Sequence, residues 1–467
     1  MFSFQVHHPT TNTAIIADDG TRLTYGDLSD FSGSVNKVIP NRCLVFLLCR
    51  NTPGALCGYF SFLTGRIVPL MLDSTINGAL LAGLIKTYKP QYLWLPDHRA
   101  DEFMPAKTVF SGYRYSLVKL ETNEGFPLHD DLAMLLATSG STGSPKFVRI
   151  SYENLAANAG SIADYLAIGE HERPVTTLPM SYSYGLSVIN SHILMGAAIL
   201  LTSKTLLEKD FWRFVKEHKA SSLSGVPYMY KILKRINFMQ MDLPSLTTLT
   251  QAGGRLSSEL VHEFATCCAG SGKKFFVMYG QTEATARMAY LPARYALQKP
   301  ESIGNAIPGG CFSLVDENGT EIEEHDTIGE LVYKGRNVSM GYANGYDDLM
   351  KGDENHGVLF TGDLAKRDSD HFYYIVGRNQ RFIKIFGNRV SLDETEILLE
   401  KIVPECACTG QDDHLVIYIT DMNRMAEVKK YISAVTEIHP TAVSVRHCVE
   451  IPRNEAGKTH FFLPDIT

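Results

Sequence analysis

The chain has 467 residues, of which 45% are hydrophobic and 20% are charged, and its formal net charge at pH 7 is -7. A chain of this length is too long for one hydrophobic core, so we expect at least two domains. The negative charge, without any run of Lys and Arg, argues against nucleic-acid binding. The apolar runs are too short to span a bilayer and the first residues lack the pattern of a signal peptide, so we expect a cytoplasmic protein without membrane insertion.

The nine cysteines are scattered among apolar neighbours. The pairs that lie close in sequence, Cys267 with Cys268 and Cys406 with Cys408, have neither C-x-x-C spacing nor a matching His. That pattern does not favour a cysteine-held metal site. We expect buried free thiols in a reducing compartment.

The N-terminal third alternates short apolar runs with stretches of helical pattern. Residues 21–28 have the pattern of a strand that turns into a helix. Further strands are expected at residues 44–48, 67–72 and 92–95, with helices at residues 53–63 and 77–86. Strands and helices that alternate at these lengths are typical of a mostly parallel sheet with helices on both faces.

A loop rich in Gly, Ser and Thr follows the buried strand expected at residues 132–137 and ends at Lys146. Gly140 and Gly143 let the backbone adopt positive φ and approach a ligand closely. The loop offers its backbone N–H groups and also four side-chain hydroxyl groups, those of Thr138, Ser139, Ser141 and Thr142. With the positive charge of Lys146, such a loop suits a polyphosphate. It lacks the Gly-Lys-Ser/Thr ending of a Walker P-loop, so a kinase or GTPase is not expected, and the alternative is a flexible linker.

The middle of the chain offers two candidate pocket walls. Ser151 is expected to cap a helix that runs to about Leu166. Beyond it, Tyr182, Tyr184 and Gly185 precede an apolar helix on a turn that can face a pocket. Aromatic side chains at such positions are also common core residues.

A second wall is expected after the helix at residues 210–218, with Val226 and Tyr228. The strand expected near residue 249 leads to Gly253 and Gly254, whose missing side chains let a flat ring lie against the backbone.

A strand expected at residues 274–279 leads directly into Gly280, Gln281, Thr282 and Glu283. A hydroxyl and a carboxylate at the carboxyl end of a strand lie where a doubly wound sheet places its ligands. The alternative is that Thr282 caps a helix with Glu283 in its first turn.

The C-terminal third changes in pattern. Residues 329–342 alternate like antiparallel strands, and Thr361-Gly362-Asp363, a triplet that is common in turns, follows a short strand expected at residues 358–360. A compact α+β region is then expected, with strands at residues 415–420 and 442–449 around a helix at residues 425–435.

Taken in order, these segments resemble the motifs of the adenylate-forming superfamily, which contains acyl- and aryl-CoA ligases, peptide-synthetase adenylation domains and luciferases. The resemblance runs from about residue 22 to residue 459 and is strongest in TSGSTGSPK, in YGQTE, at Gly377-Arg378 and at the terminal Gly457-Lys458. It is nearest to stand-alone ligases of acyl-CoA or acyl-carrier-protein type.

The resemblance implies an α/β fold in two domains. The N-terminal domain, residues 1–379, would hold parallel and mixed sheets flanked by helices, with a small β subdomain. Residues 381–467 would form a small, mobile α+β lid, somewhat short for the family. The hinge would lie at Gln380, where many relatives have Asp or Lys, so the polar contacts of the hinge stay open.

The resemblance also implies roles for individual residues. The catalytic residues would be Thr282, Glu283 and Lys458, with Glu283 also binding Mg²⁺. ATP or AMP would be bound by Thr138, Ser139, Gly140, Ser141, Thr142, Gly143, Lys146, Gly253, Gly254, Tyr279, Gly280, Asp363, Arg378 and Arg389. The acyl pocket or thiol channel would be lined by Tyr182, Tyr184, Gly185, Val226, Tyr228 and Gly387.

The activity implied is ATP- and Mg²⁺-dependent conversion of a small-molecule carboxylic acid to an acyl-adenylate, with release of pyrophosphate, and then transfer of the acyl group to a thiol. The thiol would belong to CoA or to the phosphopantetheine of a separate acyl carrier protein. Tyr182 stands near the place where peptide-synthetase domains have an Asp for the substrate ammonium, so we expect an acid without an α-ammonium group. The alternative from another class is an inactive nucleotide-binding regulatory protein.

Overall fold

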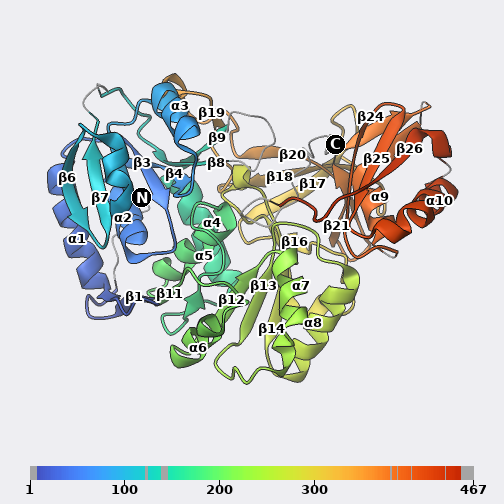
Figure 1. Ribbon diagram of the computed structural model, residues 1–467, viewed down its shortest axis with the longest axis horizontal. Coiled ribbons are helices and arrows are strands. Elements are labelled where there is room, and N and C mark those ends of the chain that lie inside the picture. Colours follow the sequence, from blue (N-terminus) through green and yellow to red (C-terminus); the bar gives the residue numbers. More distant parts are fainter. Residues whose placement is uncertain are drawn as a thin grey trace. The chain divides into compact units, whose positions relative to one another are not determined.

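The computed structural model describes residues 8–120, 125–137, 146–378, 381–386, 388–400, 402–436 and 438–453 (Figure 1). The chain divides into two compact units, each described by itself. The first comprises Met1–Pro300, Ala306–Cys311 and Lys334–Leu359, and the second comprises Glu301–Asn305, Phe312–Tyr333 and Phe360–Thr467.

An eight-stranded mixed sheet forms one half of the first unit. Its strands in spatial order are β19 (Tyr342–Ala343), β9 (Phe147–Ser151), β8 (Leu132–Ala137), β4 (Val68–Asp73), β3 (Leu44–Cys49), β5 (Tyr92–Pro96), β7 (Tyr115–Lys119) and β6 (Lys107–Gly112). The four central strands β8, β4, β3 and β5 are parallel, and the pairings outside them are antiparallel. The expected parallel sheet is thus extended by antiparallel edges.

Helices cover both faces of this sheet, because its central strands are apolar on both sides. Along β3, Val45 and Leu47 pack with residues of α1 (Tyr25–Val38) and α2 (Pro53–Thr64). The alternate residues of β3 pack with the apolar residues of α3 (Gly78–Tyr88) on the opposite face. Thr24 caps α1 in a capping box with Asp27, which fixes where that helix begins.

A nine-stranded sheet forms the other half. Its strands in spatial order are β16 (Asn305–Ala306), β15 (Ala289–Leu291), β14 (Lys274–Tyr279), β13 (Thr248–Gln251), β12 (Ser222–Gly225), β10 (Pro174–Val175), β11 (Ile199–Leu201), β1 (Thr13–Ala17) and β2 (Arg22–Thr24). The run from β14 to β1 is parallel, whereas β15 and β2 are antiparallel to their neighbours.

Five helices belong with this half: α4 (Tyr152–Leu166), α5 (Ser183–Leu194), α6 (Lys209–Glu217), α7 (Pro227–Arg235) and α8 (Ser258–Gly270). Ser151 caps α4, as the sequence predicts. Helix α5 lies between the two sheets, beside α4 in Figure 1. Leu186 and Ile189 join the apolar cluster of α1 and α2, while Tyr184 and Val188 join a smaller cluster under β13 and β14.

The second unit contains three small sheets. One has the order β17 (Gly310–Val315), β18 (Gly329–Gly335), β20 (Val358–Arg367) and β21 (Tyr373–Arg378), another pairs β22 (Phe382–Ile385) with β23 (Asn388–Ser391), and the third has the order β24 (Cys406–Gln411), β25 (His414–Ile419) and β26 (Val443–His447). Helices α9 (Leu392–Leu399) and α10 (Met425–Thr436) share an apolar cluster with β22, β25 and β26. Seven 3₁₀ segments complete the described elements: η1 (Asp97–Phe103), η2 (Phe238–Gln240), η3 (Thr282–Ala284), η4 (Ala293–Tyr295), η5 (Tyr346–Met350), η6 (Met422–Arg424) and η7 (Pro440–Ala442).

Two expectations need correction. The strand expected at residues 358–360 is longer than predicted, because β20 continues through Thr361-Gly362-Asp363 to Arg367. Gly362 has φ +69° without ending the strand, since residues 363–367 pair with β21. The prediction of buried free thiols is wrong for Cys311. All nine cysteines are free, but Cys311 is exposed on the edge strand β17.

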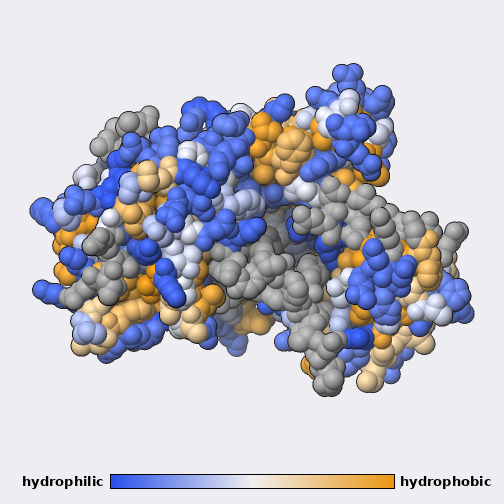
Figure 2. Space-filling view, turned by 90° about the horizontal axis from the view of Figure 1, so that it is seen from above, coloured by the Kyte–Doolittle hydropathy of each residue, from blue (hydrophilic) through white to orange (hydrophobic). Residues whose placement is uncertain are grey.

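The surface of the described residues contains both hydrophilic and hydrophobic side chains. Hydrophilic and hydrophobic residues are interspersed over the face seen in Figure 2. Large apolar side chains that are exposed, such as Leu207, Met350 and Phe360, come from different elements. Within the residues that the structure describes, no helix has the length and apolar character needed to cross a membrane.

Candidate active site

The YGQTE motif lies in a tight turn at the carboxyl end of β14. A Cβ atom at Gly280 would lie 1.6 Å from the backbone oxygen of Ala286, so the returning chain packs directly on this glycine. Thr285 and Ala286 have φ of 58° and 106°, the left-handed region that side chains disfavour. The Thr285 hydroxyl and the Ala284 carbonyl are both tied to Asn337, at 2.7 and 2.8 Å. Such strained turns persist where the surrounding contacts fix them.

Glu283 is held by a tyrosine that the sequence analysis did not select. The Tyr342 hydroxyl donates to Glu283 Oε1 at 2.7 Å, and the Ser339 N–H donates to the Glu283 carbonyl at 2.8 Å. Burial and the neighbouring carboxylate raise the pKa of Tyr342, so the phenol stays protonated as a donor. Among the described residues, Glu283 Oε2 accepts no hydrogen bond. A carboxylate oriented in this way, with one oxygen open, fits Mg²⁺, which prefers oxygen ligands.

Lys146 lies over the ring of the same tyrosine, Tyr342. Its Nζ lies 6.0 Å from the centroid of the Tyr342 ring. Lys146 is the first described residue after the phosphate loop and precedes β9. A lysine and a carboxylate are therefore arranged around one phenol ring, on segments that are far apart in the sequence. This arrangement can hold an anion and its cation together.

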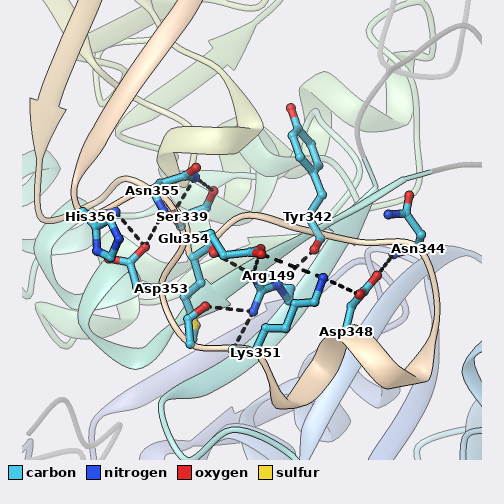
Figure 3. A network of polar contacts seen from close by, with 12 residues as sticks. Arg149, Ser339, Tyr342, Asn344, Asp348, Lys351, Asp353, Glu354, Asn355 and His356 are labelled. Atoms are coloured by element: carbon cyan, nitrogen blue, oxygen red, sulfur yellow. Dashed lines mark hydrogen bonds and ion pairs between the residues drawn. The ribbon is translucent and has the colours of Figure 1, made fainter.

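A buried arginine holds the segment that carries Tyr342 (Figure 3). Arg149 on β9 is 0% exposed, and its guanidinium donates to the carbonyls of Met340, Tyr342, Lys351 and Gly352 and to the Glu354 carboxylate. Figure 3 shows the Tyr342 carbonyl facing Arg149 and its ring extending away from the network. The arginine thus fixes the backbone from which the Tyr342 ring reaches Glu283.

Gly253, Tyr182 and Val226 meet at one place. Gly253 has φ +85°, and a Cβ atom there would lie 2.5 Å from Tyr182 Oη and 3.1 Å from Val226 Cγ1. At Gly254 the nearest atom to such a Cβ would be Pro227 Cγ, at 3.2 Å. Tyr182 and Val226 therefore occupy the space beside Gly253, and the binding of a nucleotide ring against the glycine pair stays a prediction.

The start of α5 connects the candidate acyl pocket to YGQTE. Tyr184 and Gly185 lie in the first turn of this helix, rather than on the turn before it that the sequence predicts. Tyr184 is buried and its hydroxyl lies 2.8 Å from Thr250 Oγ1. The Ser183 hydroxyl lies 3.1 Å from the Thr282 hydroxyl, so Thr282 faces α5. Gly185 is packed on the backbone, because a Cβ there would lie 2.3 Å from the Pro179 oxygen. The alternative role of Thr282 as a helix cap is wrong, since the single 3₁₀ turn η3 is preceded by Gln281 and has no side-chain cap.

The remaining candidates of the first unit lie as follows. Tyr279 is half-buried at the end of β14, and Gln281 Nε2 donates to its hydroxyl at 3.4 Å. Tyr182, Tyr184 and Val226 belong to one apolar cluster with Met278. Tyr228 is 41% exposed at the start of α7 and is not a member of that cluster.

Three candidate nucleotide-binding residues, Asp363, Arg378 and Arg389, lie in the second unit. Asp363 and Arg378 face each other across β20 and β21, and Arg378 Nε donates to Asp363 Oδ1 at 3.1 Å. Asp363 is 3% exposed. Arg389 lies on β23, and the structure describes only its backbone. Asp393 Oδ2 accepts from the Arg378 N–H at 3.1 Å, which fixes the end of β21.

Several candidates lie outside the described residues. They are Thr138, Ser139, Gly140, Ser141, Thr142, Gly143, Gln380, Gly387 and Lys458. Their proposed roles stay predictions. Among the described residues, no group of three or more His, Cys, Asp and Glu side chains gathers as a metal site.

Open α/β sheets bind ligands outside the carboxyl ends of their strands, which is where Glu283 follows β14. The chain belongs to the AMP-binding enzyme family, whose model matches residues 2–343. It is 29% identical over 338 residues to a 2-succinylbenzoate–CoA ligase of Bacillus licheniformis, covering 71% of this chain and 67% of that protein. It is 28% identical over 275 residues to an oxalate–CoA ligase of Arabidopsis thaliana, covering 58% of this chain and 52% of that protein.

Solved structures agree with the fold over nearly the whole chain. The o-succinylbenzoate CoA synthetase of Bacillus subtilis in complex with its acyl-adenylate has a TM-score of 0.78 at 20% identity, covering 96% of this chain and 94% of that one. ATP-bound MatB of Rhodopseudomonas palustris has a TM-score of 0.78 at 21% identity, covering 98% and 95%. The same B. subtilis synthetase was also solved with ATP and magnesium.

These comparisons confirm the superfamily and the mixed α/β fold that the sequence predicted. They also support the predicted enzyme class, an AMP-forming acid–thiol ligase of the acyl-CoA synthetase type. The sequence analysis missed Tyr342, which is separated from Glu283 by 59 residues. No local pattern could have paired them, because the contact exists only once β19 lies beside β9.

Proposed function

We propose that this protein activates a small carboxylic acid with ATP, forming an acyl-adenylate and pyrophosphate, and then transfers the acyl group to a thiol. The observation that carries the proposal is Glu283, held by Tyr342 beside Lys146 at the carboxyl end of β14. The family and the CoA-ligase relatives support the same reaction class.

In the first step, two anions must approach each other, because the acid is ionised at neutral pH. Lys146 contributes a positive charge near the phosphate loop. Glu283 would hold Mg²⁺, which when bound would neutralise charge on the phosphate oxygens. Tyr342 fixes one oxygen of that carboxylate, and Thr282 is oriented by Ser183. The contribution of these residues is positioning and electrostatic stabilisation rather than proton transfer.

The acceptor thiol in this proposal is CoA, since the relatives are named as CoA ligases. The phosphopantetheine of a separate acyl carrier protein is the second candidate. Thioester formation is measured with CoA and, in parallel, with a carrier protein whose phosphopantetheine thiol is free. The comparison distinguishes the two acceptors. The proposed function also includes a cytoplasmic location and a hinge at Gln380 between the N-terminal domain and the lid.

The central test is ATP–pyrophosphate exchange across a panel of aliphatic, aromatic, hydroxy and amino acids. We expect exchange with acids that lack an α-ammonium group, since Tyr182 provides no counter-charge for one. Exchange with α-amino acids and with no other acid would contradict this expectation. An absence of exchange with every acid would instead favour an inactive nucleotide-binding protein.

We predict that Glu283→Gln impairs exchange mainly by weakening the apparent affinity for Mg²⁺–ATP. The amide has the size of the carboxylate but lacks the charge that binds the cation. Exchange rates measured against Mg²⁺ concentration check this. An unchanged Mg²⁺ dependence would mean that Glu283 does not hold the metal.

A further inference from the structure

Arg287 is a buried cation that the mechanism above does not use. It is 2% exposed and lies just before β15, four residues after Glu283 in the sequence. The left-handed backbone of Thr285 and Ala286 reverses the chain after η3 and so returns Arg287 to the protein interior.

The described contacts of Arg287 are all with uncharged groups. Its Nε lies 3.1 Å from Ser187 Oγ, and its Nη1 lies 3.1 Å from Tyr165 Oη and 3.5 Å from Met278 Sδ. The guanidinium carbon lies 5.1 Å from the centroid of the Tyr184 ring. Within the described part of the chain, no carboxylate forms an ion pair with Arg287, and its Nη2 donates no hydrogen bond.

Arg149, another buried arginine of this unit, provides a contrast. Arg149 is 0% exposed, and its guanidinium donates to four carbonyls and to the Glu354 carboxylate (Figure 3). A buried charge is costly unless it is paired and fully hydrogen-bonded. Arg149 meets that condition with groups of its own chain, whereas Arg287 does not. Arg287 is therefore suited to an anion that comes from outside the chain.

The surroundings of Arg287 are those of the candidate acyl pocket. Tyr184 is a candidate pocket residue, and Ser187 lies one turn further along α5. Met278 belongs to the apolar cluster that contains Tyr184 and Val226, and Tyr165 packs against it. The positive charge of Arg287 acts on His192 of the same helix α5. Burial, and in addition the charge of Arg287, lower the pKa of His192 to about 4.

We propose that Arg287 binds a second carboxylate of the substrate, so that the enzyme activates dicarboxylic acids in preference to monocarboxylic ones. One carboxylate would react with ATP, and the other would pair with the guanidinium beside Tyr184. This inference rests on the proposed function, because it uses the same acyl pocket. The same charge repels an ammonium group, which is a second reason to expect no α-amino acid.

The test compares acids in matched pairs: straight-chain and aromatic dicarboxylic acids, the monoamides of the same acids, and monocarboxylic acids of the same length. ATP–pyrophosphate exchange gives kcat/KM for each. We expect the preferred dicarboxylic acid to exceed its monoamide by about a hundredfold or more, the range found when one partner of a buried charge pair is removed. Arg287→Met should lose that factor for the dicarboxylic acid and change monocarboxylic acids by less than about threefold. Arg287→Lys should recover part of the preference, because it keeps the charge but loses the planar fork.

Arg294→Met is the matched control. Arg294 also lies over a tyrosine ring, 4.9 Å from the centroid of Tyr295, but it is exposed. We expect this variant to keep the wild-type preference. If Arg287→Met did not fold, as judged by thermal unfolding, the wild-type comparison and Arg287→Lys would still decide.

The outcomes separate the two proposals. A wild-type enzyme that activates a monoamide as well as its dicarboxylic acid would overturn the role of Arg287 and leave the proposed function intact. Equal loss for all acids in Arg287→Met would mean that the arginine only supports the fold. No exchange with any acid would overturn the proposed function and this inference with it.

Discussion

At the scale of single residues, the candidate site is organised by a phenol. Tyr342 donates to Glu283 at 2.7 Å and presents its ring to Lys146. A hydrogen bond to a charged group contributes about 1.5–3 kcal/mol, more than one between neutral groups. The tyrosine can therefore set the direction in which the carboxylate faces a cation.

We predict that Tyr342→Phe raises the KM for Mg²⁺–ATP by about tenfold or more, because only the oriented hydrogen bond is lost. Steady-state exchange kinetics at varied Mg²⁺–ATP measure it. Tyr346→Phe is the control, since the Tyr346 ring packs under Lys89 and its hydroxyl makes no described hydrogen bond. Equal effects of both changes would argue against a specific role for Tyr342.

His192 gives a prediction about pH. Burial and, to a smaller extent, Arg287 lower its pKa from 6.5 to about 4 in the folded protein. At a pH between these two pKa values, His192 binds a proton in the unfolded chain but not in the folded one. The free energy of unfolding therefore falls as pH decreases, by at most about 1.4 kcal/mol per pH unit from this group. Urea unfolding of wild type and His192→Met at pH 7, 6 and 5 should give a flatter profile for the variant. Parallel profiles would show that His192 does not contribute.

At the scale of elements, Arg149 links β9 to the segment that runs from β19 through η5. We predict that Arg149→Met lowers the free energy of unfolding by about 3–5 kcal/mol, because several backbone carbonyls lose the donor that they share in the buried guanidinium. Denaturant unfolding checks this. Arg336→Met is the control: its ion pair with Glu153 is exposed, and a loss of about 1 kcal/mol or less is expected. A similar loss in both variants would contradict a special role for the buried network.

Elements with strong local signals could be predicted from the sequence. The apolar run of β3 and the Ser151 cap of α4 are examples, because each is fixed by residues within a few positions. The length of β20 could not be predicted, since its second half is a strand only through pairing with β21. For the site, YGQTE and Lys146 could be selected from their motifs. Tyr342 and Arg287 could not, because their roles depend on contacts between distant segments.

At the scale of the whole molecule, the two compact units are not consecutive in the chain. Residues 301–305 and 312–333 belong with the C-terminal part, and residues 334–359 return to the first unit. The segment that carries Tyr342 thus lies between two strands of the second unit, β18 and β20. The hinge predicted at Gln380 lies outside the described residues and stays a prediction.

The proposed two-step reaction and the predicted lid together imply different roles for two residues of the C-terminal part, Lys458 and Gly387. We predict that Lys458→Ala slows adenylation by ~10²–10³ but leaves thioester formation from supplied acyl-adenylate nearly intact, because its charge is needed only while two anions are joined. Gly387→Leu should block the thiol step and spare the first if this residue lines the thiol channel, as the resemblance implies. Both half-reactions are measured in both variants. Equal damage to both steps in each variant would mean that the lid does not switch.

The contact between Gly280 and Ala286 also bears on protein engineering. A Cβ at position 280 would lie 1.6 Å from a backbone oxygen, which no rotamer choice can relieve. A combinatorial library across residues 279–283, aimed at a different nucleotide, would therefore lose every member with a side chain at Gly280 to misfolding. Diversity is better placed at Tyr182 and Val226, whose side-chain atoms border the space above Gly253.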